Sequence, residues 1–240
     1  MPLMDQEDIL GLEKRIVVVT QAGRGFGRQI AHAYGRNRAT VVVVDPDAER
    51  ATEVASEVEA LGAEAIPIRG DLSVSLDVVQ TFAKIEEFFG AVDGIVHLTS
   101  GESPTPFTEL TETEWYELIG RDVKSSLLVL QHGLKYLTGG GFVVLVLPPL
   151  KRQEPHVASV RGAIQGLIEG ASAVFPEQVR VNGVIPSRDP AGEAYDLPLV
   201  RAVVGLGSMV SDGIHGEVVS VRLPEPPSPP ELYDLLADLP

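Results

Sequence analysis

A glycine-rich turn near the start of the chain has the residue types and spacing of a nucleotide-binding loop. Residues 20–27 read TQAGRGFG, directly after the apolar segment 15–20 and before a segment with helical periodicity. Gly23, Gly25 and Gly27 would let the backbone approach a pyrophosphate, which would lie at the positive N-terminal end of the helix. The alternative is a tight turn between strand and helix that binds no ligand.

An acidic residue follows where such a loop needs one. Asp45 ends the next apolar segment, 18 residues beyond Gly27. A carboxylate at this position accepts a hydrogen bond from a ribose hydroxyl, and it would repel a 2′-phosphate. The two features together predict a dinucleotide cleft and favour NAD over NADP as its ligand.

From about residue 12 to residue 222 the chain resembles the short-chain dehydrogenase/reductase family. The family motif T-G-x-x-x-G-x-G is matched at Thr20, Gly25 and Gly27, with Gln21 at the first glycine. Asp71-Leu72 matches the family's adenine-contacting segment, and the late segment VRVNGVIP at 179–186 is similar to V-N-x-x-x-P-G. The resemblance implies these cofactor contacts: Thr20, Gln21, Gly23, Arg24, Gly25, Phe26, Gly27, Asp45, Asp71, Leu72, His97, Arg161 and Pro186.

The positions that carry the family's chemistry hold other residue types. Its N-N-A-G segment falls on His97-Leu98-Thr99-Ser100, which matches at no position. The family's helix Asn, its catalytic Ser and the Tyr and Lys of its Y-x-x-x-K helix fall on Asp122, Pro148, Val157 and Arg161.

These replacements remove the proton-transfer groups that the resemblance implies. Val157 has no proton to transfer, Pro148 has no hydroxyl to hold a carbonyl, and Arg161 stays charged and cannot act as a base. Losing a positioned general acid costs a factor on the order of 10²–10⁴ in rate. His156 is the one candidate substitute acid, and its alternative role is that of a surface or capping residue.

The sequence therefore favours a non-catalytic subunit, a pseudoenzyme that keeps the assembly surface of the family. In the family, the helix expected at 157–174 packs subunits together, and here it carries small residues at Gly162, Ala163, Gly166, Gly170, Ala171 and Ala173. The expected partner is a second copy of the chain or an intact relative; packing on its own sheet is the alternative. Two other functions stay open: an active NAD-dependent oxidoreductase with non-standard catalytic residues, and an NAD(H) sensor.

These residues need a framework of alternating strands and helices, which the apolar pattern predicts. We expect a single Rossmann-type α/β domain, a doubly wound parallel sheet of about seven strands flanked by helices. Its strands are predicted at 15–20, 40–44, 64–68, 94–98, 142–147, 179–185 and 217–222. Helices are predicted after Gly27, at 48–61, from a cap at Ser73 to Phe89, from a cap at Thr113 towards Leu137, at 157–174 and at 199–210.

The last segment has a different composition. Residues 224–230 read PEPPSPP, and proline donates no hydrogen bond to a sheet. We expect one dinucleotide-binding domain over 1–223, then a Pro-rich spacer and a short helix at 231–239 within the segment 224–240.

Composition limits the partners. With 19 basic and 34 acidic residues, the formal net charge is −15, which disfavours nucleic acid and anionic membranes. Cysteine is absent and the five histidines show no metal-ligand spacing, so we expect no disulfide and no metal site. The N-terminus has no basic, apolar leader pattern, so we expect a cytoplasmic protein.

Overall fold

A parallel sheet of seven strands forms the centre of the computed structural model, which describes residues 8–175 and 178–226. The strand order is β3-β2-β1-β4-β5-β6-β7 and every neighbouring pair is parallel, which confirms the predicted fold class. The strands are β1 (Ile16–Thr20), β2 (Thr40–Asp45), β3 (Ala65–Arg69), β4 (Val92–Leu98), β5 (Leu137–Val146), β6 (Arg180–Pro186) and β7 (Val218–Val221).

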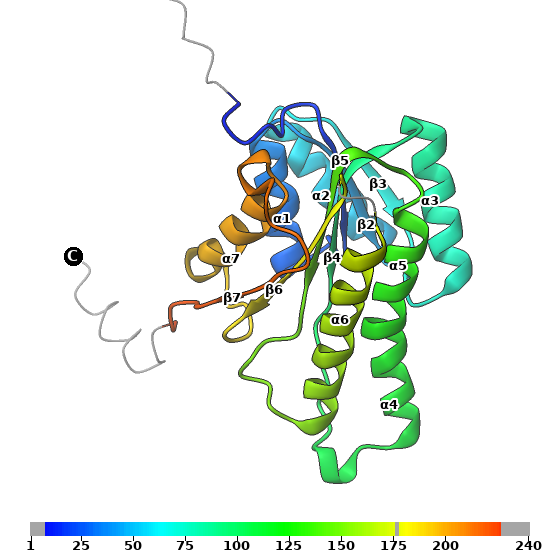
Figure 1. Ribbon diagram of the computed structural model, residues 1–240, viewed down its shortest axis with the longest axis vertical. Helices are drawn as coiled ribbons and strands as arrows, with labels where there is room; N and C mark the ends of the chain where they lie inside the picture. Colours follow the sequence, from blue (N-terminus) through cyan, green and yellow to red (C-terminus); the bar gives the residue numbers. More distant parts are fainter. Residues whose placement is uncertain (1–7, 176–177, 227–240) are drawn as a thin grey trace, which may run out of the picture.

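Helices cover both faces of the sheet (Figure 1). On one face lie α1 (Gly25–Arg36), α2 (Ala48–Ala60) and α7 (Glu193–Leu206). On the other lie α3 (Ser75–Phe89), α6 (Pro155–Val174) and a long helix built from α4 (Glu112–Leu118), the π-helical turn η2 (Ile119–Lys124) and α5 (Ser125–Gly133). Two short 3-10 turns, η1 (Phe107–Glu109) and η3 (Met209–Ser211), complete the described elements.

The continuous β-branched runs become strands that are buried on both faces. All six residues of β2 are buried, and alternate valines of the run 41–44 enter opposite hydrophobic clusters. Burying one such side chain contributes about 1.5–3 kcal/mol before entropy is considered. This packing fixes the order and register of the strands, and with them the edge of the sheet where β1 to β6 end.

Three predicted helix boundaries were wrong. The helix before β5 is capped by Thr111 rather than Thr113, because Thr111 and Glu114 form a reciprocal capping box. Ser73 does not cap α3: the capping position is Val74, and Ser73 donates to Asp71 instead. The helix expected at 199–210 runs from Glu193 to Leu206 and contains Pro198.

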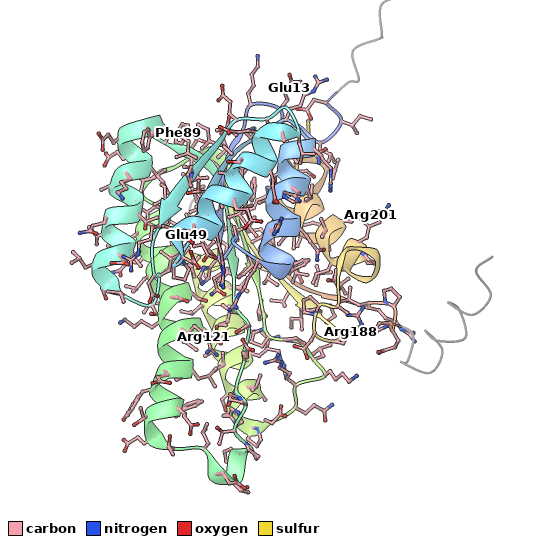
Figure 2. The ribbon with its side chains drawn as sticks, turned by 180° about the vertical axis from the view of Figure 1, so that it is seen from behind. Glu13, Glu49, Phe89, Arg121, Arg188 and Arg201 are labelled. Carbon is pink, nitrogen blue, oxygen red and sulfur yellow. The ribbon has the colours of Figure 1, made fainter. Side chains whose placement is uncertain are left out.

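Most of the predicted Pro-rich spacer and all of the predicted terminal helix lie outside the described residues, at 227–240. The domain boundary stays a prediction. None of the helices in residues 8–175 and 178–226 is long and apolar enough to span a bilayer. Arg121 and Arg188 lie towards the same end of the fold, opposite Glu13 (Figure 2). That end is where the site residues gather.

Candidate functional site

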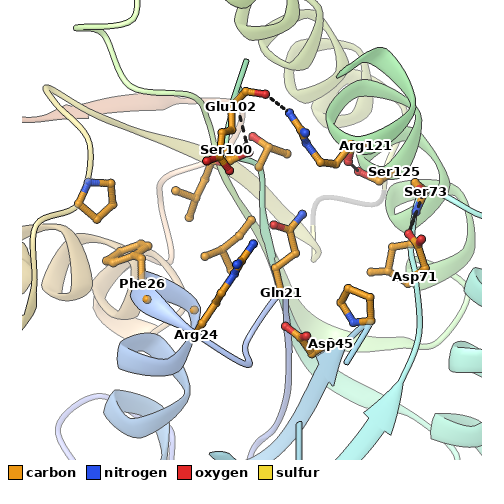
Figure 3. Close-up of a pocket in the computed structure, with 18 of the residues that line it drawn as sticks. Gln21, Arg24, Phe26, Asp45, Asp71, Ser73, Ser100, Glu102, Arg121 and Ser125 are labelled. Atoms are coloured by element: carbon orange, nitrogen blue, oxygen red, sulfur yellow. Dashed lines mark hydrogen bonds between the residues drawn. The ribbon is translucent and has the colours of Figure 1, made fainter. Parts of the chain in front are cut away.

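A cleft of about 1070 Å³ runs along the carboxyl ends of the strands, where doubly wound sheets bind ligands (Figure 3). The structure brings nine of the predicted cofactor contacts to its wall: Gln21, Arg24, Gly25, Phe26, Gly27, Asp45, Asp71, Leu72 and Pro186. It leaves four others outside the lining: Thr20, Gly23, His97 and Arg161.

Gln21 holds a backbone conformation that favours glycine. Its φ is +49°, in the left-handed region, which costs a side-chain-bearing residue roughly 1–2 kcal/mol. Its side chain projects into the cleft beside Arg24 (Figure 3) and forms no hydrogen bond with the described part of the chain. This combination of backbone strain and an unbonded carboxamide in a cleft makes the turn a candidate ligand-contacting position.

Replacing Gln21 by glycine is expected to stabilise the fold. The Gln21→Gly variant relieves the left-handed strain, and the added freedom of the unfolded chain offsets part of that gain, leaving about 0.5–1 kcal/mol. Lys14, with φ +63° and an exposed side chain, is the matched control away from the cleft. Urea unfolding should show a similar gain for Lys14→Gly; a loss of stability in Gln21→Gly would mean that the carboxamide has a structural role.

Asp45 is buried and its carboxylate organises the glycine turn. It accepts from Gly23 N at 2.8 Å and from Asp47 N at 3.0 Å, one bond to each oxygen. A Cβ atom on Gly23 would lie 2.7 Å from Asp45 Cγ, so only glycine fits there. A carboxylate has about four acceptor sites, so Asp45 keeps the capacity to accept from a ribose hydroxyl.

His97 belongs to a buried hydrogen-bond chain rather than to the cleft wall. Leu98 N donates to Thr20 Oγ1 (3.2 Å), and Thr20 Oγ1 lies 2.9 Å from His97 Nδ1. His97 Nε2 lies 3.0 Å from Ser125 Oγ, which itself donates to Arg121 O. Each hydrogen-bond donor in this chain therefore has an acceptor only if the His97 ring is neutral and carries its proton on Nε2. Burial lowers the His97 pKa from 6.5 to about 3, which agrees with a neutral ring.

Asp122, at the position of the family's Asn, ties η2 to the loop after β4. Its fully buried carboxylate accepts from Ser100 N at 3.2 Å and from Gly101 N at 2.9 Å. Burial raises the Asp122 pKa, and the Arg121 guanidinium 3.6 Å away opposes that shift. At this site Asp122 therefore accepts the hydrogen bonds that hold the loop after β4 in place.

The corner where the family's Ser and Tyr would lie is filled with hydrocarbon. Pro148 and Val157 are both buried, and the loop after β4 lies directly on them at Gly101. A Cβ atom on Gly101 would be 2.6 Å from Pro148 Cβ and 2.9 Å from Val157 Cγ1, and the φ of Gly101 is +59°. Only a glycine allows this approach, and neither Pro148 nor Val157 lines the cleft.

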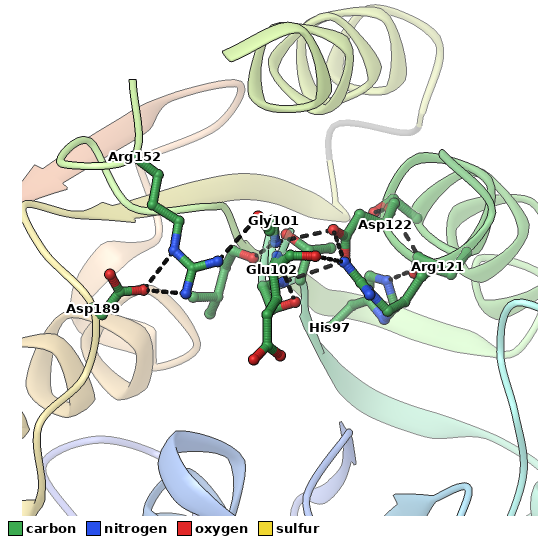
Figure 4. A network of polar contacts seen from close by, with 12 residues as sticks. His97, Gly101, Glu102, Arg121, Asp122, Arg152 and Asp189 are labelled. Atoms are coloured by element: carbon green, nitrogen blue, oxygen red, sulfur yellow. Dashed lines mark hydrogen bonds and ion pairs between the residues drawn. The ribbon is translucent and has the colours of Figure 1, made fainter. Parts of the chain in front are cut away.

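Two arginines hold this corner closed. Arg161 Nη1 donates to the carbonyls of Pro148, Pro149 and Arg152, so it bonds the loop after β5 instead of facing a ribose. Arg152 donates to Asp189 Oδ1 at 2.7 Å and to Gly101 O at 3.0 Å (Figure 4). Three loops, after β4, β5 and β6, are joined through this one guanidinium.

His156 was predicted to be either a substitute acid or a surface or capping residue. The structure contradicts a position on the surface. Its side chain is buried, neither ring nitrogen has a hydrogen-bond partner in the described chain, and it stacks on Phe107 with ring centroids 6.1 Å apart. It does not line the cleft. The turn at Phe107 folds over the start of α6, which explains why His156 is buried although it lies in the first turn of that helix.

Sequence reasoning missed Gly101 and Asp189. Their partners lie 51 and 37 residues away in the chain, at Arg152. No local spacing encodes such contacts, because they depend on how three separate loops meet. The basic residue at 152 was the only available signal.

Comparison with protein families identifies one matching model, described as short chain dehydrogenase, over residues 15–188. Among curated proteins, the chain is 28% identical over 189 residues to a hydroxynaphthalene reductase-like protein Arp2 of Metarhizium guizhouense (strain ARSEF 977), covering 75% of this chain and 70% of the relative. A Metarhizium majus (strain ARSEF 297) protein with the same description is equally similar.

Solved structures share the fold at lower identity. A hydroxysteroid dehydrogenase from Escherichia coli superposes with a TM-score of 0.82 at 22% identity, covering 91% of this chain and 99% of that one. A 7 alpha-hydroxysteroid dehydrogenase complexed with NADH and 7-oxo glycochenodeoxycholic acid gives 0.80 at 22% identity, covering 91% and 96%. At this identity the superpositions show that the fold is shared over 91% of the chain.

Proposed function

We propose, from the premise that this chain belongs to the short-chain dehydrogenase family of oxidoreductases, that it has lost catalysis and serves as a structural or regulatory subunit. The observation that carries the proposal is the contact of Gly101 with Pro148 and Val157. A reduction or oxidation needs a proton donor or acceptor at that corner. A proline, a valine and a glycine backbone supply none.

The alternative of an active enzyme with non-standard residues has less support. His156 would have to reach the substrate oxygen, yet it is enclosed against Phe107 and is not part of the cleft wall. Of the acidic residues near the corner, Asp122 already accepts two backbone N–H groups, and Asp189 is bonded to Arg152. Asp122 and Asp189 thus hold loops together, whereas the exposed side chain of Glu102, next to Gly101, lines the cleft.

A dinucleotide fits the residues at one end of the cleft and not at the other. Asp45, Asp71 and the turn before α1 suit an adenosine and its phosphates, and Asp45 favours NAD over NADP. At the other end the family's Lys position is Arg161, whose Nη1 donates to three loop carbonyls and which does not line the cleft.

The surface of α6 supports assembly with a second copy or with an intact relative. Its inner face, at Val160, Ile164 and Ile168, packs on the sheet. Gly162, Gly166 and Gly170 are exposed, and a Cβ atom on any of them would contact nothing. A smooth helix face of this kind allows another helix to approach closely.

Assays of turnover and assembly test this function. With NAD(H) and a panel of ketones and alcohols, we expect absorbance at the nicotinamide band to change at least about 10²-fold more slowly than with an intact family member. Turnover that His156→Ala abolishes would establish the active enzyme instead. Sedimentation at micromolar concentration should show an oligomer, or pull-down from native lysate an intact relative; a monomer without such a relative contradicts the subunit role.

A further inference from the structure

His156 leaves both of its ring nitrogens without a hydrogen-bond partner in the described chain, although its side chain is buried. Burial in this state raises the free energy of the closed form, because water would bond both nitrogens if the ring were exposed. We propose that residues 102–110 form a flap that opens from the start of α6 and gives His156 access to the cleft. The inference goes beyond the proposed function and does not depend on it.

Apolar contact holds the flap against α6. Phe107 stacks on His156 with an angle of 9° between the ring planes, and Phe107 is itself 53% exposed. Within the part of the chain that the structure describes, no hydrogen bond or ion pair joins residues 103–110 to α6. Most residues of the flap are exposed to solvent. Opening on this side therefore breaks few interactions and lets the His156 nitrogens bond water.

A polar latch holds the flap on the side of α4. Thr105 Oγ1 donates to Glu114 Oε1 at 2.6 Å, and Glu114 also forms the capping box at the start of α4 with Thr111. The hydrogen bond from Thr105, followed by those from Thr111, lowers the pKa of the Glu114 carboxyl from 4.5 to about 2. Glu114 is therefore ionised at neutral pH, and hydrogen bonds to an ionised acceptor are stronger than neutral ones. The latch between Thr105 and Glu114 should thus decide how often the flap opens.

The flap begins at the wall of the cleft. Glu102, its first residue, lines the cleft. The residue before it is held in place, because Gly101 N donates to Asp122 and Gly101 lies against Val157. Val157 is the neighbour of His156 in the sequence, so an opened flap would extend the cleft to that imidazole. A ring with one donor and one acceptor would then face a wall that is hydrocarbon in the closed form.

Carbethoxylation by diethyl pyrocarbonate measures the opening, because the reagent modifies accessible imidazoles. His97 is the matched control: its ring is equally buried, yet both of its nitrogens are hydrogen-bonded within the core. In the full chain at pH 7, we expect His156 to be modified at least about tenfold faster than His97, since a local opening suffices. Peptide mass spectrometry gives both rates. A His156 rate equal to or below that of His97 would mean that only global unfolding exposes it, and would overturn the inference.

Two threonine variants test the latch. Thr105→Val removes the hydroxyl that bonds Glu114 and should raise the His156 modification rate roughly three- to tenfold. Thr108→Val changes an exposed residue of the same flap, whose hydroxyl forms no hydrogen bond within the described chain, and should leave that rate unchanged. The His97 rate should stay the same in both variants. Equal effects of the two variants on His156, or a matching rise at His97, would contradict a flap released at Thr105. Neither cofactor nor substrate is present, so these rates are independent of turnover.

Discussion

Acidification from pH 7 to pH 4.5 is expected to remove about 2–3 kcal/mol of unfolding free energy through His97 alone. The ring is fully buried, and burial lowers its pKa from 6.5 to about 3. Below pH 6.5 the unfolded chain takes up a proton at this residue while the folded chain does not. Acid therefore favours the unfolded state, by about 1.4 kcal/mol per pH unit until the folded pKa is reached.

The comparison that isolates this effect uses His97→Asn, which places the family's residue type at the position. The variant breaks the chain between Thr20 and Ser125 and should be less stable than the wild type at pH 7. Asparagine does not titrate, so the difference in unfolding free energy between the wild type and His97→Asn should shrink as the pH falls. His132→Asn, outside that chain, serves as the control. Urea unfolding at several pH values measures all three; parallel pH profiles for wild type and His97→Asn would show that the buried ring carries no such linkage.

This histidine also illustrates what the sequence could and could not predict. His97 lies at the end of a predicted strand, where a hydrogen-bonded core residue is more common than a ligand, although the family resemblance placed it among the cofactor contacts. Its partners come from β1 and α5, 77 and 28 residues away, so the pattern around residue 97 does not identify them. Only the folded arrangement fixes the neutral tautomer and excludes the ring from the cleft.

The framework was predictable because its causes are local. A run such as TVVVV at 40–44 forms a strand wherever it is buried, and the glycine spacing of 23–27 specifies the turn before α1. The absence of a serine at position 148 and of a tyrosine at position 157 could likewise be predicted from the sequence. That the loop at Gly101 closes over these two residues depends on its left-handed φ and on Asp122 accepting its N–H group, which residue types alone do not reveal.

The same reasoning applies to the segment after β6, which the sequence left without a predicted ligand class. Arg188 and Asp196 are buried side chains that face each other there, with Nη1 and Oδ1 separated by 3.5 Å. Asp196 also accepts from Ala191 N at 2.9 Å and Gly192 N at 2.8 Å, and Arg188 Nε donates to Pro224 O. The segment is thus tied both to α7 and to the chain beyond β7.

Removing the buried Asp196 carboxylate should therefore destabilise the fold far more than removing an exposed carboxylate. Asp196→Ala removes the buried carboxylate that faces Arg188 and the acceptor of two backbone N–H groups, a loss of about 3–5 kcal/mol. In a chain of this size that lowers the thermal midpoint by on the order of 10 °C. Asp189, which pairs with Arg152 and is 48% exposed, is the matched comparison; its alanine variant should cost at most about 1 kcal/mol.

Scanning calorimetry of the two alanine variants distinguishes a rigid segment from a mobile one. Equal, small losses would mean that the segment after β6 moves freely enough for solvent to replace the Asp196 contacts, and this result would favour a loop that admits substrate. A large loss confined to Asp196→Ala would mean that this side of the cleft is held by buried charge. An enzyme that admits substrate through this segment would need it to open, whereas a subunit that only binds a nucleotide and assembles would not.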